Sequence, residues 1–319
     1  MNKSSLIIII FFTLVSFSCS KDNNDEPIFI DDVSLLTNYI YKTYNVSNSP
    51  NTVIDSTNFM ISDNKIISSS GLNLETLSEK TSNYSYLNGK IDKIQSFSNG
   101  TLTRIQSFGY NTNEELTEYL IENINTNDAS SSFERHTFTH TTDTIFSSWT
   151  RSNDGITFDE QVSDFKIVLV ENNNRTYLET YSYLNDDTQY EISTYEGSFN
   201  ILNESKYLIL NNGNEVLSFE NNYTTSNAVN YYNRILSNTY SRKNLMLLYH
   251  LQPSAINNIN AKSISGYRLD TYESTWGNSF AEFEISTVPN NDNINVFTNF
   301  KTIISGNLFS RFSQEFIFN

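Results

Sequence analysis

The chain has 319 residues, of which 36 are acidic and 20 basic, giving a formal net charge of −16. An acidic surface repels phosphate groups, so the composition argues against a nucleic-acid-binding protein. With 22 Phe and 20 Tyr and only 18% charged residues, the chain has enough apolar material for a sizeable core, which excludes a largely disordered protein.

The N-terminus has the features of a secretory signal peptide. Lys3 supplies a short positive region, and residues 6–15 form an almost unbroken apolar run, too short to cross a bilayer as a mature helix. Small residues flank Phe17 just before Cys19, which suits ordinary signal cleavage. The segment also resembles the lipobox of bacterial lipoproteins, whose cysteine is linked to diacylglycerol and becomes the first mature residue. We expect lipidation of Cys19, although Ser16 stands where a lipobox usually has Leu.

Cys19 is the only cysteine, so its use for lipid leaves no disulfide. Two or three acyl chains hold a protein firmly, because each buried CH₂ contributes about 0.8 kcal/mol. The acidic stretch that follows resembles the export tag that sends Bacteroidota lipoproteins to the outer face of the outer membrane. It equally fits an ordinary solvated tether. Its charged residues are Lys21, Asp22, Asp25 and Glu26. We therefore expect an outer-membrane protein displayed on the cell surface, with covalent lipid as its only cofactor.

The chain divides into a signal peptide at 1–18, a lipidated acidic tether at 19–32 and a β-rich repeat domain at 33–319. The domain begins with an apolar segment, residues 33–42, that fits either an opening strand or a short helix. A polar stretch around Pro50 follows and reads as a turn.

A pattern then recurs, beginning at Phe59, Tyr84, Phe108 and, less clearly, Phe138, so successive starts are 25, 24 and 30 residues apart. In each copy apolar residues alternate at period two, a turn of the Asn-Gly type follows, and a second β-rich run comes after the turn. This is the sequence signature of a β-hairpin. Repetition at this period indicates stacked units. Weaker copies begin at Tyr181 and Tyr207.

Two segments also carry helical patterns. Residues 114–124 fit a helical stripe as well as a strand, and residues 230–251 are the other helical candidate. Strand patterns resume at 267–272, 280–285, 296–304 and 308–318. We therefore expect an all-β protein, with antiparallel β-hairpin repeats in one extended or curled sheet or sandwich and at most one or two short helices.

The repeats resemble the Tyr-Asp (YD, or RHS-like) repeats of Bacteroidota surface lipoproteins. In those repeats an aromatic-x-Tyr-Asp-x-x-Gly-Lys-Leu unit forms successive hairpins of a long antiparallel sheet. The resemblance covers about residues 55–220 and is closest at residues 84–91, where Leu87 replaces the Asp. It implies a hairpin architecture and no particular activity.

The candidate catalytic groups form no recognised motif. His136 and His140 lie in a β-like alternation that separates them by roughly 13 Å, too far to share one metal ion. We interpret both as partly exposed strand residues. The adjacent acids at 114–115, 159–160 and 186–187 point to opposite faces of a strand, which does not suit a glycosidase pair. The sequence predicts neither a catalytic set nor a metal site.

Trp149 and Trp276 are candidates for stacking on sugar rings, although Trp is usually mostly buried and the core is the favoured place for both. The anchor, the tether, the β scaffold and the lack of a coherent catalytic motif predict a non-catalytic binding or interaction module for a glycan or a surface protein. The alternatives are an envelope-associated hydrolase whose site is assembled only in the fold, and a purely structural envelope protein.

Overall fold

The computed structural model describes residues 36–45, 52–128, 130–170, 175–184, 186–196, 201–211, 214–240, 244–245, 247–248, 262–271, 279–290, 293–302 and 308–318. All of them belong to one compact unit, Asp31–Asn319. The predicted signal peptide, Cys19, the charged residues of the tether and Trp276 lie outside the described residues. No helix within these ranges has the length and apolar character needed to cross a membrane.

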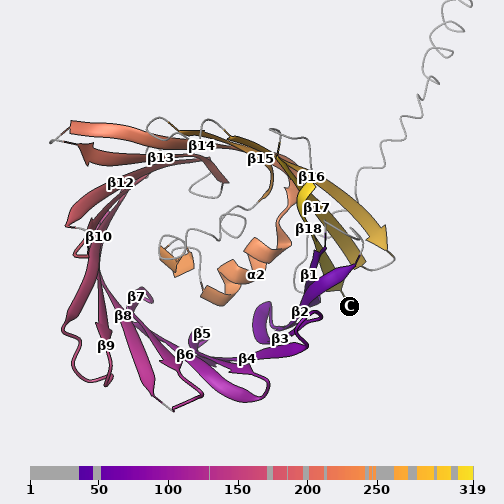
Figure 1. Ribbon diagram of the computed structural model, residues 1–319, viewed down its shortest axis with the longest axis horizontal. Coiled ribbons are helices and arrows are strands. Elements are labelled where there is room, and N and C mark those ends of the chain that lie inside the picture. Colours follow the sequence, from indigo (N-terminus) through magenta and orange to yellow (C-terminus); the bar gives the residue numbers. More distant parts are fainter. Residues whose placement is uncertain are drawn as a thin grey trace, which may run out of the picture. The chain divides into compact units, whose positions relative to one another are not determined.

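The described residues form one sheet of 18 strands together with helix α2 (Tyr231–Tyr240). Each strand pairs antiparallel with the next one in the sequence, and β18 pairs with β1, so the sheet closes on itself (Figure 1). The strands are β1 (Leu36–Tyr44), β2 (Val53–Ser62), β3 (Lys65–Asn73), β4 (Ser78–Leu87), β5 (Lys90–Ser98), β6 (Thr101–Tyr110), β7 (Leu116–Ile124), β8 (Ser131–His140), β9 (Thr144–Ser152), β10 (Glu160–Val170), β11 (Arg175–Ser182), β12 (Asp187–Glu196), β13 (Ile201–Asn211), β14 (Asn214–Val229), β15 (Lys262–Thr271), β16 (Ser279–Asn290), β17 (Asn293–Thr302) and β18 (Leu308–Phe318). The prediction of an all-β fold of antiparallel hairpins is confirmed, in the form of a single curled sheet.

The short turns between strands explain why the hairpin pattern is so regular. Asn88 (φ 52°) and Gly89 (φ 78°) join β4 to β5, and the two-residue turns at 63–64 and 99–100 also use left-handed backbone. Two-residue hairpins need positive φ at both positions, which Asn and Gly adopt at low cost. The Asn-rich turns therefore fix the register of the strands that they connect.

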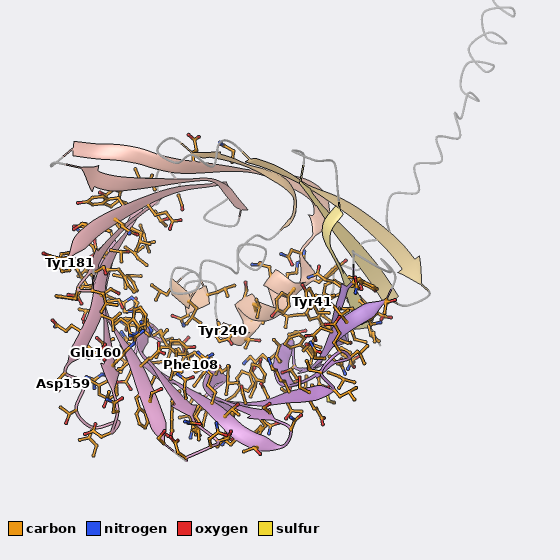
Figure 2. All side chains as sticks on the ribbon, in the orientation of Figure 1. Tyr41, Phe108, Asp159, Glu160, Tyr181 and Tyr240 are labelled. Carbon is orange, nitrogen blue, oxygen red and sulfur yellow. The ribbon has the colours of Figure 1, made fainter. Side chains whose placement is uncertain are left out.

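The inner face of the sheet carries aromatic side chains that pack on helix α2. Tyr39 of β1 stacks on Phe59 of β2, with ring centroids 5.3 Å apart, and on Tyr232 of the helix at 4.6 Å. Phe108 of β6 contacts Tyr240 at the other end of the helix, at 5.9 Å. Figure 2 shows Phe108 and Tyr240 on the same side of the strands. Phe59 and Phe108, which open two of the repeats, therefore belong to the core.

Hydrogen bonds also hold the helical segment against the sheet. The backbone N–H of Ile66 in β3 donates to the Thr239 hydroxyl at 3.3 Å, and that of Leu116 in β7 donates to Asn244 Oδ1 at 3.2 Å. Both strand residues lie beside a shift in register. Irregular pairing leaves backbone groups without a ladder partner, and a buried N–H needs one. Thr239 and Asn244 supply it.

The structure settles the two segments whose type the sequence left open. Residues 36–42 of the first segment belong to strand β1 and residues 116–124 of the second to strand β7. The 230–251 candidate contains α2 and further helical residues at 244–245 and 247–248.

The interpretation of the two strand histidines as partly exposed is wrong for His136, which is 6% exposed. His140 is partly exposed as a residue, although only 4% of its side chain is accessible. Both side chains lie on the inner face of β8, in alternation with Thr137 and Thr139, which are exposed. The sequence showed that alternation but not which of its faces is covered.

Candidate functional site

The outer face of the sheet carries polar and charged side chains. Lys93 of β5 and Glu118 of β7 are exposed in mid-strand, where they neighbour the buried Ile94 and Tyr119. Charged groups are almost never placed on a covered apolar surface without a partner. This face is therefore built for contact with water and polar ligands.

A groove of about 370 Å³ lies over strands β8 to β11. The cross-strand register arranges its outward side chains in two neighbouring rows, about 6.6 Å apart along the strands. The first row holds Thr139, Phe146, Lys166 and Glu179, and the second holds Thr137, Ser148, Asp164 and Tyr181. The buried Ser147 and Phe165 complete the lining.

Asp164 lies in the middle of this groove. The Tyr183 hydroxyl donates to Asp164 Oδ2 at 2.6 Å, and this hydrogen bond raises the pKa of Tyr183, which keeps the donor protonated. The other oxygen, Oδ1, is buried and has no hydrogen-bond partner among the described residues. An unpaired buried acceptor costs about 1–3 kcal/mol, so a hydroxyl donor that reaches Oδ1 removes this cost.

Phe146 and Tyr181 are the aromatic walls of the groove. Phe146 is 45% exposed, which is unusual for a ring of that size. Tyr181 meets the edge of Tyr183, with ring centroids 4.9 Å apart and an interplanar angle of 86°, and its hydroxyl donates to Asp186. These contacts fix the Tyr181 ring in place. In Figure 2 Tyr181 lies on the side of the strands away from Phe108 and Tyr240.

The charges of the groove are mixed. Lys166 sits beside Phe146 on one side and Glu179 on the other, and Asp164 is two residues before it on the same strand. One basic and two acidic groups give the groove a formal charge of −1. A ligand in this groove meets donors and acceptors of both kinds with a slight excess of acid.

Trp149 lies on the inner face of β9 rather than in the groove. Its ring stacks on His136 at 5.3 Å, and His136 stacks in turn on Tyr119 at 5.9 Å. Burial lowers the pKa of His136 to about 4, so the imidazole is neutral at physiological pH. Trp149 thus continues an aromatic ladder that starts with Phe108 and Tyr119 at 5.0 Å. Its use for stacking on a ligand stays a prediction.

The adjacent acids that the sequence offered enter separate contacts. Glu114 pairs with Lys90 at 2.6 Å, Glu115 accepts a hydrogen bond from the Asn111 side chain at 2.9 Å, and Glu160 lies 3.7 Å from Arg151. Within the described part of the chain, no group of three or more His, Cys, Asp or Glu residues is placed to hold a metal ion.

Phe146, Asp164 and Tyr181 belong to no motif that the sequence offered for ligand binding. The sequence set only Tyr181 apart, because it begins a weaker repeat whose distance from Phe138 departs from the period of the earlier copies. The other two residues are drawn into the groove only by the pairing of β9 with β10 and of β10 with β11.

No protein-family model matches the chain, and no curated protein matches it. Among solved structures, it is similar to a porin-like protein from Bacteroides uniformis, with a TM-score of 0.41 and 9% identity over 89% of this chain and 98% of that one. A porin-like protein from Bacteroides vulgatus gives a TM-score of 0.29 and 12% identity over the same shares of the two chains. Both similarities are too distant to carry an inference about function.

Proposed function

We propose that the protein is an exported, lipid-anchored binding module of the outer membrane that holds a glycan on the outer face of its sheet without altering it. The observation that carries the proposal is Asp164 Oδ1, a buried acceptor with no partner among the described residues, between two aromatic walls. Sugars present hydroxyl donors around an apolar ring face. Binding sites commonly combine aromatic walls with a few placed polar groups.

The test asks whether a polysaccharide gel retains the protein while the polysaccharide stays uncleaved. The full-length protein, extracted in detergent, is run through native gels that contain laminarin, mannan, xylan or dextran, and the gels are assayed for new reducing ends. We expect slower migration in at least one polysaccharide and no product. Release of reducing ends supports the hydrolase alternative instead, and no retention on any glycan contradicts the binding module.

The location of the module rests on Cys19 and is tested separately. We expect wild-type protein to float with outer membranes and to incorporate labelled palmitate, whereas Cys19→Ala releases the protein and abolishes the label. A variant that stays membrane-bound contradicts lipid anchoring.

Surface display rests on the acidic tether. Protease treatment of intact cells is expected to remove the β-rich domain, and neutralising Asp22, Asp25 and Glu26 together is expected to protect it. Equal digestion of both forms contradicts an export role for these residues.

A further inference from the structure

We infer that the groove takes a neutral oligosaccharide of at least two sugar rings, lying across β9, β10 and β11. The inference rests on the proposed function and adds to it the class of glycan and the residues that select it.

The spacing of the aromatic walls sets the minimum length of the ligand. Phe146 is on β9 and Tyr181 on β11, in neighbouring rows and with β10 between them. A strand spacing of about 4.8 Å and a rise of about 3.3 Å per residue put their Cα atoms about 12 Å apart. One sugar ring does not cover both side chains at that separation. Two or more linked rings do, so occupancy of both walls requires an oligosaccharide.

The polar groups between the walls fit the hydroxyls of such a chain. Asp164 Oδ1 accepts from one hydroxyl, while its other oxygen remains bound to Tyr183. The Lys166 ammonium donates to a second hydroxyl from the neighbouring row. Because both side chains come from β10, they contact the middle of a ligand whose ends lie on Phe146 and Tyr181.

The charge of the groove selects an uncharged chain. Asp164 and Glu179 outnumber Lys166, and the whole chain carries a formal charge of −16. A glycan with a uronate or sulfate group on every sugar is repelled by this negative charge. A polycation is disfavoured locally, since Lys166 lies beside Phe146 in the first row. A neutral glycan is repelled by neither set of charges.

The test compares matched ligands on the full-length protein. Affinities are measured for dextran against dextran sulfate, and for oligomers of one to six sugars derived from laminarin, mannan and xylan. We expect oligomers of two or more rings to bind at least about tenfold more tightly than the monosaccharide, and dextran sulfate to bind no better than dextran. Equal affinity for monosaccharide and oligomer, or preference for the sulfated chain, overturns the inference.

Substitutions assign the binding to the groove. Tyr181→Ala and Phe146→Ala are each expected to weaken oligosaccharide binding about tenfold. Asp164→Asn removes one acceptor while keeping another for Tyr183, and it is also expected to weaken binding. Met60→Ala is the control, because the exposed fraction of Met60, 48%, is similar to that of Phe146, whereas Met60 lies outside the groove, on β2. Glycan binding that survives both aromatic substitutions overturns this site but leaves the binding module standing, whereas absence of all glycan binding overturns both.

Discussion

Phe108 and Tyr181 open two copies of one sequence pattern but end on opposite faces of the sheet. Phe108 is 7% exposed and contacts Tyr119 and the helical Tyr240. Tyr181 lines the outer groove beside Tyr183, which is 40% exposed. The same local sequence therefore builds the core at one place and the candidate site at another.

The position of each ring relative to the end of its strand explains the difference. Phe108 lies two residues before Tyr110, the last residue of β6 that pairs with β7, whereas Tyr181 lies one residue before Ser182, the last residue of β11 that pairs with β12. Both strand ends lie on the inner face, since Tyr110 packs against the core and Ser182 alternates with the buried Leu178. Successive side chains point to opposite faces, so an offset of one residue moves the ring from the core to the outer face.

The largest contrast is expected in stability. Phe108→Ala removes a buried ring that the helix packs on, and it should lower the free energy of unfolding by about 3–5 kcal/mol. Tyr181→Ala removes a ring on the outer face and should change the same quantity by less than about 1 kcal/mol. Urea denaturation of both variants measures the difference. Similar losses of unfolding free energy in the two variants contradict the assignment of Phe108 to the core and Tyr181 to the outer face.

A second contrast concerns pH. Burial lowers the pKa of His136 to about 4, below the ordinary value near 6.5 that it has in the unfolded chain. The unfolded state therefore binds the proton first as the pH falls. Stability from this group is complete above about pH 6.5 and is lost between 6.5 and 4, by about 3 kcal/mol.

The His136→Phe variant isolates this effect from acid denaturation in general, because it keeps a ring between Tyr119 and Trp149. Unfolding free energies of wild type and variant, measured from pH 7 to pH 4, are expected to converge or cross as the wild type loses stability. Parallel curves over that range contradict a buried neutral histidine.

A smaller contrast separates two asparagines. Asn244→Ala leaves the buried N–H of Leu116 without its acceptor and should cost about 1–3 kcal/mol. Asn83→Ala, at an exposed position of β4, should stay within about 0.5 kcal/mol of wild type. Thermal unfolding of the two variants side by side makes the comparison. Equal shifts show that Asn244 does not pin the helical segment to the sheet.

Much of the fold follows from local sequence, because hairpins are local. The Asn-Gly turn after Tyr86 and the alternation before it are enough to predict the pairing of β4 with β5. Closure is different, since β1 pairs with β18 through residues such as Thr37 and Ile317, 280 positions apart. The local sequence of either strand does not show that the two strands pair.

The candidate site was harder to predict than the fold for a related reason. Which face of a strand carries a given residue depends on where the strand ends, and a difference of one residue exchanges the two faces. The sequence consequently indicated a partly exposed His136, although this residue stacks on Trp149 inside the sheet. Phe146 and Asp164 gained a role only from their neighbours across the strands.

Thiol labelling tests the assignment of the two faces most directly. Cys19 is the only cysteine, so a Cys19→Ala chain offers a background without thiols for single-cysteine variants. Tyr181→Cys should react with a maleimide in the folded protein nearly as fast as in urea, whereas Phe108→Cys should react only when the protein unfolds. Labelling of both positions at similar rates in the folded protein, or protection of Tyr181→Cys, contradicts the assignment of the repeated pattern to opposite faces.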